Sequence, residues 1–225
     1  MEKLLHRIMA RFIRKFNECW VPDIEEGGGF AGELSHPVST NLKVKYMGIL
    51  SRFYGMKATQ QPIHNKGLKK ILFLISGPEK QRTVFENIIR NELSQIPKEY
   101  DYTVIRGLIS ENKSIGHSWL PHADSETMLR LITEADLIIC RAGYSSIMDL
   151  IAFGKTAILI PTPGQTEQEY LAGYLSERGY FYSQKQDKFK LSKALSEFEN
   201  TTRKILPNTI NETMLKACLE QLPLK

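Results

Sequence analysis

The segment from Arg141 to Asp149 combines an arginine, a glycine, two serines and a carboxylate within nine residues. Ser145 and Ser146 stand where a helix N-cap is expected, and a helix N-terminus carries unpaired N–H groups and roughly +0.5 of an elementary charge. Such an end can bind an anion, and the Asp149 carboxylate one turn later can accept hydrogen bonds from hydroxyl groups. Taken alone, the segment also fits an ordinary turn between a strand and a helix, with a solvated arginine.

Two elements must hold these groups in place. Residues 136–140 form a short apolar run with β-branched members, typical of a strand buried on both faces. The run stops at Arg141-Ala142-Gly143, and from Tyr144 the apolar residues repeat at helical spacing. We therefore predict a strand, a turn at Gly143 and a helix. Ligands of open α/β sheets bind at that edge, outside the carboxyl ends of the strands.

The segment continues into a longer ordered series. Gly154-Lys155 precedes a second apolar strand, 156–160, and a Pro-x-Pro loop with a glutamine follows it. Together, residues 135–175 resemble the donor-binding motif of MurG-like glycosyltransferases, that is, the C-terminal domain of glycosyltransferase family 28 on the GT-B fold. The resemblance covers residues 66–184 well and the preceding segment more weakly.

The resemblance implies an α/β fold with a doubly wound, Rossmann-like parallel sheet. This would be the C-terminal half of a GT-B glycosyltransferase with a remnant of the N-terminal domain. In this interpretation residues 1–53 are the tail of the N-terminal acceptor domain, 54–67 a linker and 68–225 the donor-binding domain with C-terminal helices. Apolar patterning predicts strands at 70–76, 102–105, 156–160 and 180–183, and helices at 79–95, 191–204 and 208–222.

The resemblance also implies which residues bind a UDP-sugar donor. Ser76-Gly77 resembles the turn that faces the donor diphosphate, and the backbone around Pro121 and His122 would read uracil. Asp149 would accept hydrogen bonds from the ribose, and the pair Glu167-Gln168 would contact the sugar hydroxyls. The predicted donor-binding set is Ser76, Gly77, Pro121, His122, Arg141, Gly143, Tyr144, Ser145, Ser146, Asp149, Gln165, Glu167 and Gln168.

Several of these residues have a plainer interpretation. Arg141 either pairs with a phosphate or carboxylate, or braces the turn. The polar residues 165–168 are alternatively a helix cap, and a loop histidine such as His122 is more often solvated or stacked than a catalytic base. Two positions depart from the family pattern: Pro78 removes one N–H from the phosphate turn, and Leu171 stands where many related sequences have asparagine.

For the function, the resemblance implies an inverting hexosyltransferase. It would move a hexose or N-acetylhexosamine from a UDP-sugar to an acceptor hydroxyl on a glycolipid or cell-envelope glycan. The general base of such enzymes lies on the N-terminal domain, so we expect this chain to supply donor binding and to need a separate acceptor domain. The alternatives are a non-catalytic UDP-sugar-binding subunit, a GT-B UDP-sugar epimerase and a structural fragment.

Residues 3–17 predict a basic amphipathic helix. Such a helix either packs on a neighbouring domain, which we favour, or rests on an anionic membrane surface. The predicted apolar stripe is Leu5, Ile8, Met9, Phe12 and Phe16, and the flanking basic residues are Arg7, Arg11, Arg14 and Lys15.

A glycine-rich stretch follows at residues 23–37. Gly27, Gly29 and Gly32 satisfy the GxGxxG spacing of dinucleotide-binding proteins. The residues after Gly32 do not continue as an apolar-periodic helix, and Pro37 would interrupt one. We therefore predict a flexible loop here instead of a dinucleotide site.

Composition excludes several other classes of protein. The 225 residues form one large or two small domains, without a membrane-spanning run or a signal-peptide pattern at the start. Residues 1–20 hold +3 of the formal net charge of +5, so the basic excess is local and does not indicate nucleic-acid binding. We expect reduced cysteines, no metal and no cofactor, since the UDP-sugar is a substrate. The predicted location is cytoplasmic, and the membrane alternative for residues 3–17 would add peripheral contact to the inner face of the plasma membrane.

Overall fold

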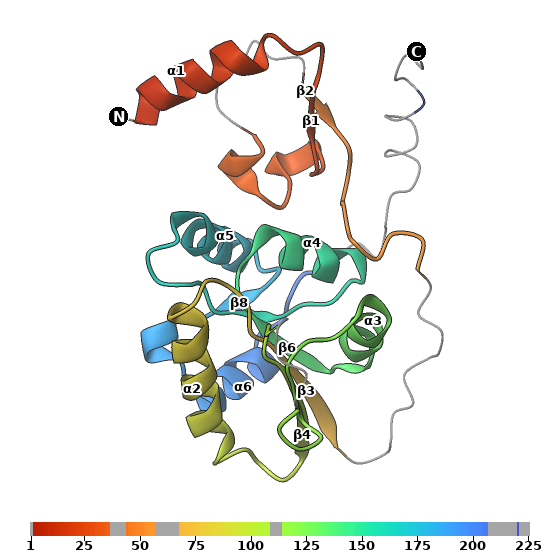
Figure 1. Ribbon diagram of the computed structural model, residues 1–225, viewed down its shortest axis with the longest axis vertical. Helices are drawn as coiled ribbons and strands as arrows, with labels where there is room; N and C mark the ends of the chain where they lie inside the picture. The colour runs from red at the N-terminus through yellow and green to blue at the C-terminus, as the bar shows by residue number, and fades with distance from the viewer. Residues whose placement is uncertain (1, 37–43, 57–67, 109–113, 207–219, 221–225) are drawn as a thin grey trace.

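The computed structural model describes residues 2–36, 44–56, 68–108, 114–206 and 220 (Figure 1). Its main body is a six-stranded sheet in the order β5-β4-β3-β6-β7-β8, and every neighbouring pair is parallel. The strands are β3 (Lys69–Leu74), β4 (Tyr100–Ile105), β5 (Trp119–Leu120), β6 (Leu137–Cys140), β7 (Ile158–Leu159) and β8 (Tyr182–Ser183). The sequence order reverses between β3 and β6, and this switch point is where such sheets bind ligands.

Helices cover both faces of the sheet, which makes three layers (Figure 1). On one face α3 (Ser125–Glu134), α4 (Tyr144–Ala152) and α5 (Thr166–Glu177) bury residues such as Leu129, Ile147 and Leu175. On the other face α2 (Gln81–Leu93) and α6 (Leu191–Asn200) bury Phe85 and Leu195. The strands are buried from both sides, as continuous apolar runs predict. The predicted doubly wound parallel sheet is confirmed.

A smaller N-terminal part sits beside α4 and α5 (Figure 1). It contains α1 (Glu2–Ile13) and two parallel strands, β1 (Cys19–Val21) and β2 (Val44–Tyr46). Between them the chain makes two 3₁₀ turns, η1 (Glu26–Gly28) and η2 (Gly32–Leu34); a third, η3 (Gln186–Lys188), precedes α6. Phe53, in the segment after β2, is buried in the same core as α4 and packs on Phe153.

The glycine-rich loop, residues 23–36, is tightly built around one carboxylate. The fully buried Asp23 accepts hydrogen bonds from the N–H groups of Ile24, Phe30 and Ala31 and from the Ser35 hydroxyl. These charge-assisted bonds satisfy a carboxylate that would otherwise be costly to bury. The prediction of a flexible loop is therefore wrong for these residues. The sequence alone does not show that the loop folds around hydrogen bonds to Asp23.

Side chains of α5 and α4 attach this loop to the sheet domain. The Tyr174 hydroxyl donates to the carbonyls of Gly28 and Gly29, and Arg178 donates to those of Gly27 and Gly29. The Tyr144 hydroxyl donates to the Pro22 carbonyl. The N-terminal part is therefore hydrogen-bonded to the helices that flank the predicted donor edge.

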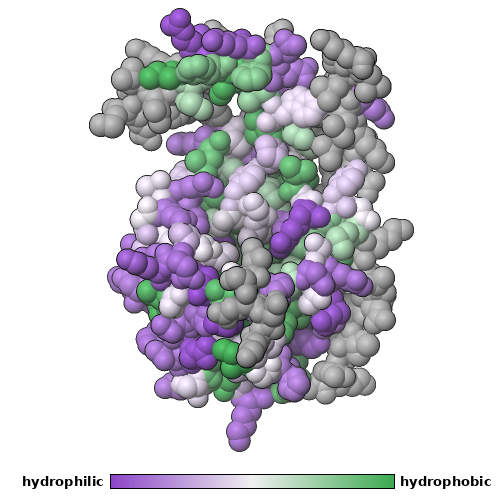
Figure 2. Space-filling view, in the orientation of Figure 1, coloured by the Kyte–Doolittle hydropathy of each residue, from purple (hydrophilic) through white to green (hydrophobic). Residues whose placement is uncertain are grey.

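Helix α1 presents exposed apolar side chains. Ile8, Met9 and Phe12 are exposed, as is Phe16, which lies beyond the end of α1 at Ile13 although the sequence predicts a helix to residue 17. Figure 2 shows hydrophobic residues along α1 next to hydrophilic ones. The amphipathic pattern predicted for this helix is confirmed for these residues. No helix in the part of the chain that the structure describes is both long and apolar enough to cross a membrane.

Several local predictions need correction or lie outside the described residues. The apolar pattern of the predicted helix 79–95 predicts that Val84, Phe85 and Ile89 face inward; Phe85 and Ile89 are fully buried, but Val84 is exposed. Strand β3 ends at Leu74 instead of residue 76, and α2 runs from Gln81 to Leu93 instead of from 79 to 95. Residues 57–67 of the predicted linker, and all but residue 220 of the predicted helix 208–222, lie outside the described residues.

Candidate functional site

The buried Arg141 connects the turn between β6 and α4 to the neighbouring loops. Arg141 is 1% exposed and donates to the carbonyls of Ile160 (3.2 Å), Pro161 (3.4 Å) and Gln81 (3.0 Å). Its guanidinium also lies 4.1 Å from the ring centroid of Phe85. Burial lowers the pKa of Arg141 to about 10. Arg141 therefore ties three loops together, which is the bracing role, and its position is not that of an exposed phosphate ligand.

The N-terminus of α4 is capped differently from the prediction. Gly143 is the N-cap, with extended backbone angles, and Tyr144 is the first helical residue. Ser145 and Ser146 lie inside the first turn, where Ser145 is exposed and Ser146 is half-buried. An N-cap serine is therefore absent at this end, but the helix N-terminus still opens outward, since no heavy atom of the described residues approaches within 4 Å of a Cβ built on Gly143.

The Asp149 carboxylate is buried against the N-terminal part of the chain. Asp149 is 5% exposed; its Oδ1 accepts from the Ser51 hydroxyl at 2.7 Å and from the Arg52 N–H at 3.2 Å. Its Oδ2 lies 3.0 Å from the Nε of Arg52. Burial raises the pKa of Asp149, and the bonds from Ser51 and Arg52 only partly offset this rise. A carboxylate offers about four acceptor positions, so one on Oδ2 is left for another hydroxyl.

The turn after β3 stands next to the β6–α4 turn at the switch point. Ser76 and Gly77 are exposed, and Gly77 has a positive φ of 107°, which favours glycine. The following Lys80 is the N-cap of α2 and also has a positive φ, 67°, which is uncommon outside glycine. The bond from Arg141 to the Gln81 carbonyl links this turn to the end of β6.

The loop between β7 and α5 forms a third side of the site. Gln168 accepts a hydrogen bond from the Thr162 N–H at 2.9 Å and donates to the Gln165 side chain. Gln165 is the N-cap of α5 by position, and Glu167 is exposed in the first turn. In this structure Gln168 shapes the loop, which supports the helix-cap interpretation for that residue. Glu167 is available to solvent.

Pro121 and His122 follow β5 at the far end of the same edge. Pro121 is buried and its carbonyl accepts from the Leu108 N–H at 2.8 Å, whereas His122 is exposed. Asp124 caps α3 by accepting from the Thr127 N–H. Hydrogen bonds from Arg141 join the loops after β3, β6 and β7 to one another, but no hydrogen bond among the described residues joins His122 to them.

Sequence reasoning missed four residues that the structure places at this edge: Ser51, Arg52, Gln81 and Thr162. Arg52 brings a half-exposed cation from the N-terminal part to the Asp149 carboxylate. The separation of 97 residues between the two leaves no local pattern to detect. Thr162 follows Pro161 in the Pro-x-Pro loop, which was noted only as a motif.

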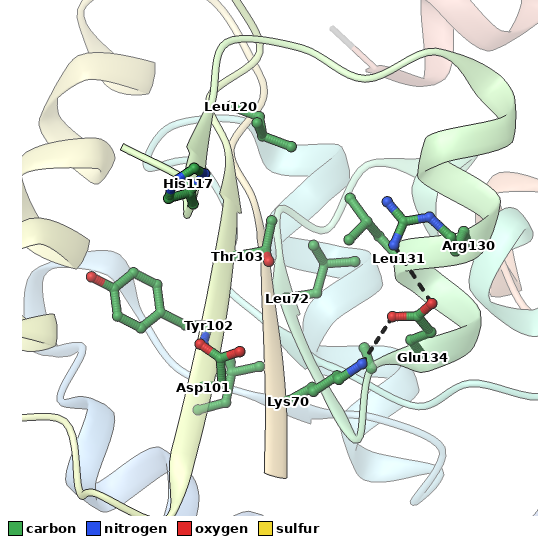
Figure 3. A pocket seen from close by; sticks show the side chains of 12 residues that line it. Lys70, Leu72, Asp101, Tyr102, Thr103, His117, Leu120, Arg130, Leu131 and Glu134 are labelled. Atoms are coloured by element: carbon green, nitrogen blue, oxygen red, sulfur yellow. Dashed lines mark hydrogen bonds and ion pairs between the residues drawn. The ribbon is translucent and has the colours of Figure 1, made fainter. Parts of the chain in front are cut away.

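A hollow of about 260 Å³ lies elsewhere, at the amino ends of the strands (Figure 3). Lys70 and Asp101 at the starts of β3 and β4, and Glu134 at the end of α3, contribute to its lining. Lys70 and Arg130 both form ion pairs with Glu134. Because ligands of parallel sheets bind at the carboxyl ends, this hollow is not the candidate site. Among the described residues, no group of three or more His, Cys, Asp and Glu is placed to bind a metal.

Comparison with known proteins adds the family. A model of the glycosyltransferase family 28 C-terminal domain matches residues 79–221, more than half of the chain. The UDP-N-acetylglucosamine--N-acetylmuramyl-(pentapeptide) pyrophosphoryl-undecaprenol N-acetylglucosamine transferase of Clostridium perfringens (strain ATCC 13124) is 29% identical over 148 residues, which are 61% of this chain and 41% of the relative. The enzyme of the same name from Desulforudis audaxviator is 53% identical over 51 residues, 22% of this chain and 14% of the relative.

The chain thus spans less than half the length of these two relatives. Among solved structures, the glycotransferase of kitacinnamycin superposes with a TM-score of 0.53 at 13% identity, covering 85% of this chain and 47% of the other. This likeness concerns the fold alone. The family match and the parallel sheet agree with each other, and the chain therefore belongs to glycosyltransferase family 28, through its C-terminal domain, and has the α/β fold of GT-B glycosyltransferases.

Proposed function

We propose that this chain is the donor-binding part of an inverting glycosyltransferase that moves a hexose or N-acetylhexosamine from a UDP-sugar to an acceptor hydroxyl. The observation that carries the proposal is the set of loops braced by Arg141 at the switch point, where the N-termini of α2 and α4 end beside each other. Two helix N-termini supply N–H groups and positive potential to a diphosphate.

The chemistry assigned to this edge is stabilisation of the leaving group. When the bond between the sugar and the diphosphate breaks, negative charge develops on the UDP oxygens. Fixed N–H groups at the Ser76-Gly77 turn and after Gly143 stabilise that charge without having to reorganise. We assign the uracil to the backbone near Pro121 and His122, and the sugar hydroxyls to Glu167 with Gln165 and Gln168.

Asp149 is assigned to the ribose, but only part of its carboxylate is free to bind it. Its Oδ1 is occupied by Ser51 and Arg52, so a ribose hydroxyl would bond to the remaining position on Oδ2. Arg52 then lies at the same rim with its side chain 55% exposed, and it adds a positive charge from the N-terminal part of the chain. Tyr144, by contrast, uses its hydroxyl to hold Pro22.

The acceptor and the general base are assigned to a further domain. The relatives are named as transferases that act on an undecaprenol-linked acceptor, which favours a lipid-linked or glycan acceptor here. We infer a cytoplasmic location, and a neighbouring domain that covers the exposed apolar side chains of α1. The alternative is peripheral contact of the same helix with anionic lipid at the inner face of the plasma membrane.

Titration calorimetry with UDP tests the donor assignment. We expect weak binding by the chain as given and no transfer of sugar without an acceptor domain. Absence of both heat and a thermal shift at millimolar UDP would contradict the donor assignment. Sugar transfer by the isolated chain would overturn the need for an acceptor domain, and interconversion of the sugar without transfer would indicate an epimerase.

A further inference from the structure

The β7–α5 loop contains a hydroxyl that is buried without a hydrogen-bond partner. The side chain of Thr162 is 1% exposed, and its Oγ1 makes no hydrogen bond to any described residue. Buried hydroxyl groups are normally paired, because leaving one unpaired loses the bonds that it would make to water. The position of Thr162 therefore needs an explanation beyond packing.

The hydroxyl faces the turn between β3 and α2. If Gly77 carried a Cβ, the Thr162 Oγ1 would be 3.8 Å away from it, and apart from Gly77 and its two chain neighbours no other described residue has a heavy atom within 4 Å. Gly77 is itself exposed and has a φ of 107°. The Thr162 hydroxyl therefore lies beside the exposed Gly77 turn, at van der Waals distance from the position of the missing side chain.

The loop is held so that this hydroxyl keeps its direction. The Thr162 N–H is bonded to Gln168 at 2.9 Å, and the preceding carbonyls of Ile160 and Pro161 accept from Arg141. The Nε of Arg141 is a second buried polar atom without a partner among the described residues. The Thr162 hydroxyl and the Arg141 Nε are therefore two buried polar groups without partners on neighbouring loops, and Arg141 also bonds to Gln81, the first residue of α2.

We propose that Thr162 is a donor-binding residue whose hydroxyl donates a hydrogen bond to a phosphate oxygen of a nucleoside diphosphate seated at the Gly77 turn. The assignment rests on the proposed function. It also accounts for Pro78, which removes one N–H from this phosphate turn. The hydroxyl from the neighbouring loop replaces the lost donor, and the phosphate in turn satisfies a group that is unpaired in the free chain.

The test compares Thr162→Val, which keeps the shape and removes the hydroxyl, with Thr162→Ser, which keeps the hydroxyl. Calorimetry on the full chain uses UDP and uridine as separate probes. We expect about tenfold weaker UDP binding by Thr162→Val, near-normal binding by Thr162→Ser, and no change for uridine. The melting temperature of free Thr162→Val should not fall, because the hydroxyl makes no bond in the free chain.

The outcomes separate this inference from the proposed function. Wild-type chain that binds no UDP contradicts the proposed function and the Thr162 assignment with it. Normal UDP binding by both wild type and Thr162→Val overturns the Thr162 assignment alone. Equal losses of affinity for UDP and uridine also overturn it, because uridine has no phosphate. Such losses would mean that the substitution disturbs the loop and does not remove a phosphate contact.

Discussion

The Asp149 carboxylate accepts a 2.7 Å hydrogen bond from the Ser51 hydroxyl, across 98 positions of sequence. The same carboxylate pairs with Arg52, so a residue predicted to bind the ribose also fastens the N-terminal part of the chain to α4. In the proposed function, ribose binding and attachment of the two parts would share this one side chain.

Replacement of Ser51 and Asp149 separates these two roles. Ser51→Ala should lower the free energy of unfolding by about 1–2 kcal/mol, because one buried carboxylate oxygen loses its hydroxyl partner, and should leave UDP affinity unchanged. Asp149→Ala should lower the stability and also cost about 1–3 kcal/mol of UDP affinity. Urea unfolding and calorimetry measure the two effects. Unchanged UDP affinity in Asp149→Ala would leave that residue with the structural role alone.

Arg141→Lys tests the brace beneath the β6–α4 turn. A single amine cannot serve the carbonyls of Ile160, Pro161 and Gln81 together, nor stack on Phe85 as a planar guanidinium does. We expect the free energy of unfolding to fall by about 3 kcal/mol. At a temperature where the variant is folded, UDP affinity should stay within about threefold of the wild type. A large loss of affinity with intact stability would show direct phosphate contact.

Gly29→Ala tests the order of the glycine-rich loop, with Gly27→Ala as its comparison. Gly29 (φ 59°, ψ −160°) lies in a region that is open essentially only to glycine, whereas Gly27 (φ 62°, ψ 19°) lies in the left-handed helical region, where alanine costs less. A Cβ on Gly29 would collide with the Asp23 carboxylate, whereas one on Gly27 meets only Arg178, at 4.0 Å. Gly29→Ala should therefore cost about 1–3 kcal/mol more in unfolding free energy. Equal costs would mean that the loop is not packed around Asp23.

Glu86 gives the clearest prediction for pH. Its buried carboxylate receives bonds from Arg82 (2.8 Å), Arg106 (3.0 Å) and Arg90 (3.0 Å). Burial by itself raises the pKa of Glu86, but the bonds from Arg82 and Arg106 outweigh it, so the folded pKa lies below its ordinary value. The resulting stability is present above the unfolded pKa of about 4.3 and is lost as the pH falls through the folded pKa.

Glu86→Gln should therefore flatten the acid limb of the stability profile. At pH 7 the variant should unfold about 3 kcal/mol more easily, because Arg82 is left buried with one fewer anion. Between pH 5 and pH 3 it should lose less stability than the wild type. Urea unfolding across this range, with the exposed Glu177→Gln as a control, measures the difference. Parallel profiles would show that Glu86 has an ordinary pKa.

The sequence by itself determined the parallel sheet, the turn at Gly143 and the edge at which a ligand would bind. These follow from continuous apolar runs, from apolar patterns of period 3.6 and from glycine positions, which act over a few neighbouring residues.

Only the tertiary structure decided how the polar side chains are used. The partners of Asp149 lie 97 and 98 positions away, and Arg141 bonds to carbonyls 19, 20 and 60 positions away. The loop around Asp23 and the buried Thr162 hydroxyl likewise depend on which elements pack together. A hydrogen bond requires close approach of two atoms in space, and local periodicity carries no information on approaches across such separations.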